Sequence, residues 1–214
     1  MSRRLPVYLV LDTSGSMLGE GIEAMKTGLE TLLSALRQDP YALETVHLSV
    51  ITFDTNARQA VPLTEVAAFR APDLRATGTT SLGAALTLLS TSIEREVSKG
   101  TTEQRGDWKP LVFLMTDGAP TDDWKAGQAA LAQTPISTLV ACAAGPDAKL
   151  EVLRALTEAV VTLDTADAST IKAFFRWVSA SVAMSSQKVD LTKREVGGLG
   201  DLPPPPPSIN VAGL

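Results

Sequence analysis

One cysteine and one histidine occur among the 214 residues of this sequence. Cys142 cannot form a disulfide within the chain, and no cysteine–histidine cluster has the spacing of a zinc or iron–sulfur site. Such sparse cysteine is typical of a reducing compartment, so we expect a cytoplasmic protein. Because both residues lie in apolar runs, we interpret Cys142 as core filler and His47 as a structural residue.

Long hydrophobic stretches are also missing. The first apolar run, Leu5 to Leu11, ends at Asp12, and no small-residue cleavage pattern follows it, which argues against a secretory signal. No other stretch approaches the roughly 20 apolar residues that a membrane-spanning helix needs. We therefore expect a soluble protein that is neither exported nor embedded in a membrane.

Positive charge is the scarcer of the two signs, because 19 lysines and arginines stand against 24 aspartates and glutamates, a net charge of −5. Surfaces that bind nucleic acid or anionic membranes are usually basic, so this balance disfavours both partners. The length and the hydrophobic content of 44% are those of one globular domain, and two full domains would be a tight fit.

Short apolar runs alternate with longer stretches of helical period. The runs that we interpret as strands are Leu5 to Leu11, Val46 to Phe53, Leu111 to Met115, Ile136 to Cys142 and Val160 to Leu163, with Ala57 to Leu63 as a candidate edge strand. Apolar residues at helical spacing recur between Ile22 and Leu36, between Leu82 and Ile93, and between Ile171 and Val182. This alternation predicts an α/β fold with a doubly wound, mostly parallel central sheet and helices on both faces.

The composition changes after residue 185, where a polar stretch leads to the proline run Pro203 to Pro207. We therefore divide the chain into a domain of residues 1–185 and a polar, proline-rich tail of residues 186–214. Consecutive prolines favour an extended polyproline helix, so the tail suits a stiff spacer, a segment packed on the surface, or a ligand for an aromatic groove. Within the tail, the segment Gly197 to Leu214 lacks a periodic apolar face, and we expect that deleting it leaves the melting temperature nearly unchanged.

A turn rich in oxygen atoms follows the first predicted strand. Asp12-Thr13-Ser14-Gly15-Ser16 places a carboxylate and two hydroxyls at alternate positions, and glycine permits a tight backbone there. Three hard oxygen donors from one loop suit Mg²⁺ or Mn²⁺. Taken alone, the pattern fits a helix N-cap better than a metal site.

Two further turns of this kind occupy equivalent places. Gly78-Thr79-Thr80-Ser81-Leu82-Gly83 precedes a predicted helix, and Leu114-Met115-Thr116-Asp117-Gly118 ends a predicted strand. In a doubly wound sheet the loops after the strands gather at one edge, and a crevice opens where the strand order reverses. Asp12 and Asp117 can therefore share one ion if their strands are neighbours at that point.

With these three turns the sequence resembles the von Willebrand factor A domains over about Leu5 to Met184. That family has a Rossmann-like fold and a metal-ion-dependent adhesion site. The resemblance implies that the metal-site residues are Asp12, Ser14, Ser16, Thr80 and Asp117. It also implies that the aspartates act directly or through bound waters. Thr79 is an alternative to Thr80, which better matches the third position of the Gly-x-Thr turn.

A narrower resemblance is to the tellurium-resistance-associated, TerY-type proteins of bacteria. It is carried by the segments Arg4 to Tyr8, Asp39 to Thr45, Pro120 to Trp124 and Ile171 to Phe175. This resemblance implies a chemical-stress system that includes a protein kinase and a metal-dependent protein phosphatase.

The function that these residues favour is non-catalytic binding of an acidic partner residue through the ion. An ion held largely by neutral hydroxyls and waters remains electrophilic, so a partner's Asp or Glu carboxylate can replace a bound water. One alternative is a Mg²⁺-dependent phosphoryl-transfer enzyme. Enzymes of the haloacid dehalogenase type have an Asp-x-Asp motif whose second aspartate acts as acid and base, but this sequence has Ser14 at that position. A structural scaffold with a non-functional metal site is the other alternative.

Other polar residues have structural explanations. Asp122 and Asp123 precede Trp124 at a predicted helix start, where capping explains them, with partner contact as the alternative. We interpret the loop Ser98 to Asp107 as a solvated connection, again with partner recognition as the alternative.

Overall fold

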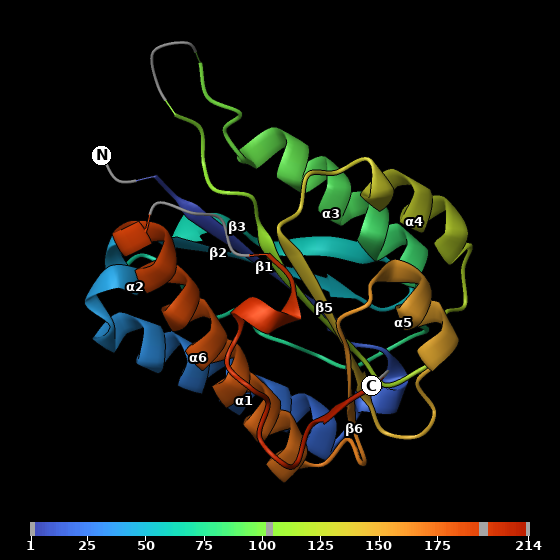
Figure 1. Cartoon of the computed structure of the whole chain (residues 1–214). Helices are drawn as coiled ribbons and strands as arrows, with labels where there is room; N and C mark the ends of the chain where they lie inside the picture. The colour runs from blue at the N-terminus through green and yellow to red at the C-terminus, as the bar shows by residue number, and fades with distance from the viewer. Residues whose placement is uncertain (1–2, 102–104, 193–196, 213–214) are drawn as a thin grey trace.

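The computed structural model describes residues 3–101, 105–192 and 197–212, which form a sheet covered by helices on both faces (Figure 1). Within these residues the sheet has seven strands. They are β1 (Leu5–Asp12), β2 (Val46–Phe53), β3 (Ala57–Glu65), β4 (Leu111–Thr116), β5 (Thr138–Ala144), β6 (Val160–Leu163) and β7 (Asn210–Val211).

The strand order β3-β2-β1-β4-β5-β6-β7 places the first strand beside the fourth at the centre of the sheet. The five strands from β2 to β6 in this order are parallel, whereas β3 and β7 pair antiparallel at the two edges. The chain runs from β1 toward one edge and then returns to β4 on the other side of β1. The strand order therefore reverses between β1 and β4, which is the place where doubly wound sheets open a binding crevice.

Two layers of helices bury the faces of the sheet. The helices α1 (Glu20–Gln38), α2 (Pro40–Thr45) and α6 (Ala168–Thr192) cover one face, and α3 (Leu82–Glu96), α4 (Trp124–Ala132) and α5 (Leu150–Leu156) cover the other. Two short 3-10 helices, η1 (Gly15–Met17) and η2 (Leu199–Asp201), complete the described elements. This arrangement confirms the predicted α/β fold.

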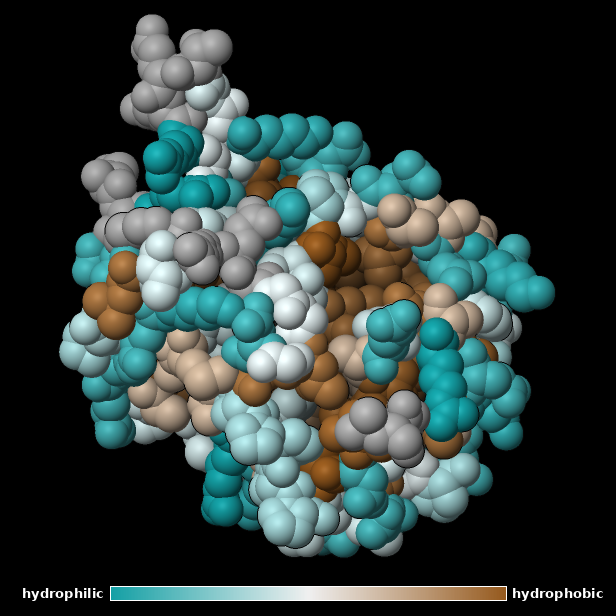
Figure 2. All heavy atoms as spheres, in the orientation of Figure 1, coloured by the Kyte–Doolittle hydropathy of each residue, from teal (hydrophilic) through white to brown (hydrophobic). Residues whose placement is uncertain are grey.

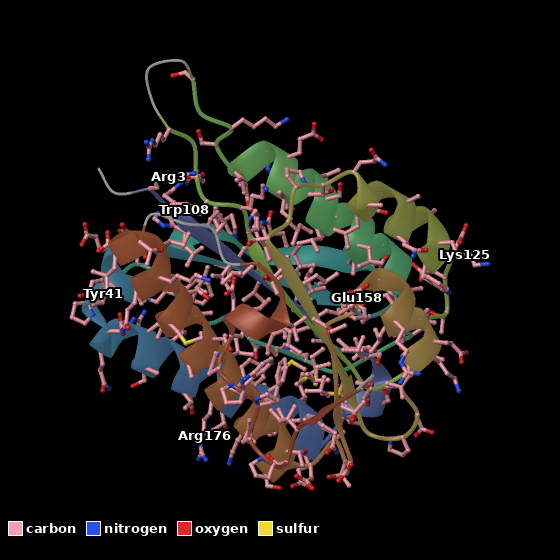
Figure 3. The ribbon with its side chains drawn as sticks, viewed as in Figure 1. Arg3, Tyr41, Trp108, Lys125, Glu158 and Arg176 are labelled. Atoms are coloured by element: carbon pink, nitrogen blue, oxygen red, sulfur yellow. The ribbon has the colours of Figure 1, made fainter. Side chains whose placement is uncertain are left out.

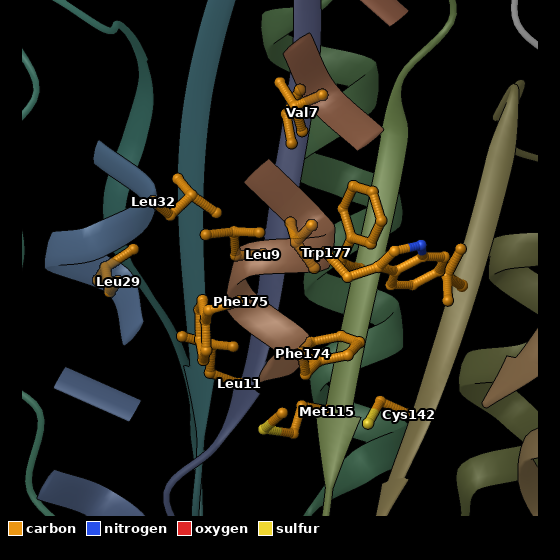
Figure 4. Packing of buried hydrophobic residues seen from close by; sticks show 14 of the residues in the cluster. Val7, Leu9, Leu11, Leu29, Leu32, Met115, Cys142, Phe174, Phe175 and Trp177 are labelled. Atoms are coloured by element: carbon orange, nitrogen blue, oxygen red, sulfur yellow. The ribbon is translucent and has the colours of Figure 1, made fainter. Parts of the chain in front are cut away.

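The protein has two hydrophobic cores, one on each face of the sheet, and alternate side chains of β1 point into one or the other. Val7, Leu9 and Leu11 face the layer of α1 and α6, while Tyr8 and Val10 face the layer of α3 and α4. In the first core, α6 lays aromatic rings against β1, β4 and β5 (Figure 4). The predicted role of Cys142 as core filler fits its place here, where it is fully buried.

A glycine lets α1 approach α6 closely. A Cβ atom at Gly28 would lie 2.4 Å from Cδ2 of Phe175, so any larger residue would push the two helices apart. Because α1 begins just after the Asp12 turn, this contact also ties the turn to α6.

Most predicted elements are found in the structure with small shifts at their ends. The five predicted strands all form, and the candidate edge strand is β3, which extends to Glu65. The helices α2 and α5 and the strand β7 were not expected from the sequence. Each of these has seven residues or fewer, too short to show a hydrophobic period.

The boundary expected at residue 185 differs from the structure. The last helix, α6, continues to Thr192, and its residues Ser185, Ser186 and Val189 are buried. Their small or apolar side chains fill the space against α1 and α2, so the polar appearance of this stretch did not mark an exposed segment.

Residues 197–212 are docked on the domain. Leu202 and Ile209 are 6% and 4% exposed within the first core, and the indole N–H of Trp177 donates to the carbonyl of Pro203 at 2.8 Å. The strand β7 then pairs with β6. Of the three uses that the sequence left open for the tail, this segment adopts packing on the surface, and two aliphatic anchors achieve it without any periodic face.

The loop that follows α3 is anchored where the chain enters β1. The guanidinium of Arg4 donates to the carboxylate of Asp107 at 2.6 and 2.9 Å, and Arg3 stacks over the ring of Trp108 (Figure 3). Residues 102–104 of this loop lie outside the described part. The base of the loop is thus an organised structure rather than only a solvated connection, and it lies at the opposite end of β1 from Asp12.

No helix among the described residues is long and apolar enough to cross a membrane. The space-filling view shows hydrophilic side chains over much of this side of the molecule and apolar ones in a hollow beside α4, α5 and the C-terminal segment (Figure 2). Leu131, Ile136, Leu139 and Leu156 line part of this hollow.

Candidate metal centre

The two aspartates singled out in the sequence come together where the strand order reverses. Asp12 is the last residue of β1, and Asp117 directly follows β4. The strands are in register with Leu11 opposite Met115, so their ends lie side by side. Residues more than 100 positions apart in the chain therefore meet at one edge of the sheet, as the predicted fold required.

Asp12 is fully buried and held by hydrogen bonds to both of its oxygens. The backbone N–H of Ser14 donates to Oδ1 at 2.8 Å, and the hydroxyl of Thr116 donates to Oδ2 at 2.5 Å. Burial raises the pKa of Asp12, while the hydrogen bonds from Ser14 and Thr116 oppose that shift. The carboxylate is thus fixed in orientation in a place where a negative charge is poorly solvated.

The two serines link the first turn to Asp117. The hydroxyls of Ser14 and Ser16 are 2.9 Å apart, and Ser16 donates to Oδ1 of Asp117 at 2.7 Å. Ser14 is buried and Ser16 is exposed, so this chain of oxygens leads from the interior to the surface. Burial also raises the pKa of Asp117, which is only 7% exposed.

Thr80 lies close to Ser16 and to Gly118, the residue after Asp117. A Cβ atom at Gly118 would be 3.3 Å from the hydroxyl of Thr80 and 3.9 Å from that of Ser16. Thr80 is 6% exposed, whereas Thr79 is exposed and directs its N–H to Thr55. The position of Thr80 beside Ser16 and Gly118 thus favours it over Thr79 for the threonine role.

A second set of contacts holds the loop before α3 against the first turn. The N–H of Gly15 donates to the carbonyl of Gly78 at 3.0 Å, and the N–H of Thr77 donates to the carbonyl of Thr13 at 2.9 Å. A Cβ atom at Gly15 would lie 3.2 Å from that same carbonyl of Gly78, so the close approach suits glycine.

The chemistry of these donors fits a hard divalent cation. Two carboxylates and three hydroxyls supply only oxygen, the ligand type that Mg²⁺ and Mn²⁺ prefer. Across the described residues no three or more His, Cys, Asp or Glu side chains are grouped so that they could hold a metal ion, so a cation here would depend on the hydroxyls as well as on the two carboxylates. A cation would also offset the unfavourable burial of two negative charges.

Two residues of this region, Thr116 and Asp122, have roles that were not predicted from the sequence. Thr116 is buried and donates to Asp12, but a threonine at the end of a strand carries no signal of such a role. Asp123 caps α4 as predicted, accepting from the N–H of Lys125 at 3.2 Å. Asp122 does not: its carboxylate accepts from the N–H groups of Gly83 and Ala84, each at 2.9 Å, and so caps α3.

His47 lies in β2, where the structural role predicted for it fits a half-buried ring. Its Nδ1 is 3.4 Å from the carbonyl of Thr45, and burial lowers its pKa.

Comparison with known proteins agrees with the fold. Residues 7–176 match the model of the von Willebrand factor type A domain, and since this is well over half of the chain, the protein belongs to that family. No curated protein sequence matches the chain.

Several solved structures share the fold. Proximal thread matrix protein 1 from the mussel byssus is 18% identical with a TM-score of 0.63, and the match covers 85% of this chain and 48% of that one. The pilus adhesin SpaC from Lactobacillus rhamnosus GG is 15% identical with a TM-score of 0.67, covering 86% and 31%. A von Willebrand factor type A protein from Catenulispora acidiphila is 18% identical with a TM-score of 0.61, covering 86% and 43%.

These similarities establish the fold. The present chain spans less than half the length of these three proteins. One structure of the mussel protein is described as having a zinc-occupied MIDAS motif, the metal-ion-dependent adhesion site of the family.

Proposed function

We propose that this domain is a non-catalytic binding module that holds Mg²⁺ or Mn²⁺ and uses it to grip a carboxylate of a protein partner. The residues assigned to the cation are Asp12, Ser14, Ser16, Thr80 and Asp117. The observation that carries the proposal is their convergence at the ends of β1 and β4, where the strand order reverses, with the Ser16 hydroxyl donating to Asp117 at 2.7 Å.

The hydrogen bonds support a different proposed task for each side chain. Ser16 gives its proton to Asp117, so its lone pairs remain available to a cation. Both oxygens of Asp12 already accept hydrogen bonds from the protein, and this favours its contact with the cation through a bound water. Thr80 adds an oxygen without adding charge.

The bound cation would act as an electrophile for a partner's Asp or Glu side chain. Only two of the five side chains proposed to hold the cation are carboxylates, so their negative charge does not exceed the cation's positive charge. Binding of an additional carboxylate from a partner is therefore favourable. Ser16 is the exposed member of the group, so the partner would approach on its side. Leu18 is close by in the sequence and 73% exposed, and offers an apolar contact at the rim.

The cellular setting is a finer proposal. The segments shared with TerY-type proteins support a role in a bacterial tellurium or chemical-stress system, with a protein kinase and a metal-dependent phosphatase as partners. The sparse cysteine supports a cytoplasmic location.

The first experiment measures cation binding. Calorimetry on chelator-stripped protein should detect one Mg²⁺ or Mn²⁺ site, weakened by Asp12→Ala or Asp117→Ala while circular dichroism shows an intact fold. Equal binding by wild type and both variants would refute the assigned site.

The second experiment concerns the partner. Affinity capture in Mg²⁺ and in EDTA should identify proteins retained only with the cation, and Thr80→Ala should weaken their binding by about 1 to 3 kcal/mol, the range for losing a polar contact to a charged group. Excess Mg²⁺ should recover part of this loss.

The same preparation separates the alternatives. An enzyme would hydrolyse a generic phosphate ester with Mg²⁺, at a rate that falls in Asp12→Ala. If neither turnover nor cation-dependent capture occurs, the site is structural.

A further inference from the structure

The N-terminus of α3 is capped by a residue from another part of the chain. Ser81 occupies the N-cap position, but its side chain makes no capping hydrogen bond and instead donates to the carbonyl of Thr55 at 2.9 Å. The vacant role is taken by Asp122, which accepts from Gly83 and Ala84. A carboxylate at this position satisfies two free N–H groups and complements the helix dipole.

The neighbouring residue Thr121 adds a second pair of contacts. Its N–H donates to the carbonyl of Thr80 at 2.9 Å, and its hydroxyl accepts from the N–H of Thr80 at 3.2 Å. The backbone of Thr80 is therefore held on both sides by the segment that follows β4. That same segment begins with Asp117.

The approach of the two segments is close enough to restrict the residue types. A Cβ atom at Gly83 would lie 2.5 Å from the carbonyl oxygen of Asp123, and one at Gly127 would lie 2.4 Å from the carbonyl oxygen of Gly83. Both glycines thus permit the N-termini of α3 and α4 to meet, which brings Asp122 within reach of α3.

We propose that Asp122 is a positioning residue for the metal centre: it clamps the loop carrying Thr80 to the segment carrying Asp117 and so preforms the cation site without touching the cation. This inference rests on the proposed function. Thr80 lies in an irregular loop, and a hydroxyl there would sample many positions if its backbone were free. Holding it in place lowers the entropy lost when a cation binds.

Asp123 offers a matched control because it is adjacent to Asp122, carries the same carboxylate and also caps a helix. It differs in that it caps its own helix α4 and has no hydrogen bond to the loop that carries Thr80. Asp122→Ala and Asp123→Ala should both lower the melting temperature through a lost cap. Only Asp122→Ala should weaken Mg²⁺ binding, by about five- to tenfold, the lower part of the range for coupled sites. Asp122→Asn, which keeps one acceptor oxygen, should fall between wild type and Asp122→Ala.

A double-mutant cycle separates positioning from general destabilisation. In a Thr80→Ala background, where no hydroxyl remains to be positioned, Asp122→Ala should change the Mg²⁺ affinity by less than about twofold. The coupling is reciprocal, so Mg²⁺ should slow amide hydrogen exchange at Gly83 and Ala84 in wild type and not in Thr80→Ala.

Two results would overturn the proposal: wild-type Mg²⁺ affinity in Asp122→Ala, or an equal loss with and without the Thr80 hydroxyl. Should Asp122→Ala fail to fold, Asp122→Asn carries the same comparison. If the wild-type protein itself binds neither Mg²⁺ nor Mn²⁺, the proposed function fails together with this inference. If wild type binds Mg²⁺ and the substitution at Asp122 leaves the affinity unchanged, this inference fails but the proposed function stands.

Discussion

Docking of the C-terminal segment is the structural feature that most changes what the sequence alone suggested, and Ile209 tests it. Ile209 is 4% exposed and belongs to the core that α6 shares with the sheet. Replacing a buried isoleucine by alanine removes apolar contact and leaves a cavity, at a cost of 2 to 5 kcal/mol in typical cores. Because this residue lies in a surface segment that can partly relax, we expect about 2 to 3 kcal/mol.

The assay is chemical and thermal denaturation followed by circular dichroism. For a domain of this size each kcal/mol lowers the melting temperature by about 2 to 4 °C, so Ile209→Ala should melt about 4 to 12 °C below wild type. Pro207→Ala is the matched control, since Pro207 is exposed in the same segment and its loss should cost less than about 0.5 kcal/mol. Deleting residues 197–214 should lower the melting temperature by more than about 5 °C.

Equal stability of Ile209→Ala, Pro207→Ala and wild type would refute the argument that these aliphatic anchors hold the segment. A deletion with unchanged melting temperature would restore the earlier expectation of a tail that contributes nothing to folding. Loss of a partner without loss of stability would instead favour a proline run that acts as a ligand.

Three further predictions concern the site and the segment. Gly118→Ala should weaken cation binding without unfolding the domain, because its methyl group would lie 3.3 Å from the Thr80 hydroxyl and displace it slightly; calorimetry that finds wild-type affinity would contradict this. Leu18→Ser should weaken cation-dependent capture of a partner, whereas Leu191→Ser, at a similarly exposed position, should not, and identical capture by the two variants would remove Leu18 from the interface. The salt bridge to α6 lowers the pKa of Asp201, so its contribution to docking is complete above the unfolded pKa of aspartate and is lost as pH falls through the lower folded value. Cleavage of the segment by an acid-stable protease should therefore accelerate with falling pH in wild type, and Asp201→Asn should lack this dependence.

The site could be predicted as far as it depends on strand ends and residue types. Asp12 and Asp117 follow apolar runs, and parallel strands in a doubly wound sheet bring such ends to one edge. The hydroxyls of Ser14 and Ser16 follow at alternate positions of the first turn, so local sequence specifies both the donors and the turn that presents them. The choice between Thr79 and Thr80 needed the family resemblance, and the structure adds the burial of Thr80 as a physical reason.

The remaining features depend on contacts between residues distant in the chain, which sequence patterns do not encode. Asp122 and Asp123 are indistinguishable as neighbouring acids before a helix, and only the packing of α3 against α4 directs Asp122 to the N-terminus of α3. Thr116 gains its role because β4 lies beside β1. Leu202 and Ile209 are isolated aliphatic residues in a polar, proline-rich stretch, and they became core residues because α6 and the sheet leave space for them. The sequence by itself therefore determined the longer elements and the candidate donor atoms, whereas tertiary packing decided which polar groups hold those candidates in place and where the chain's last described segment lies.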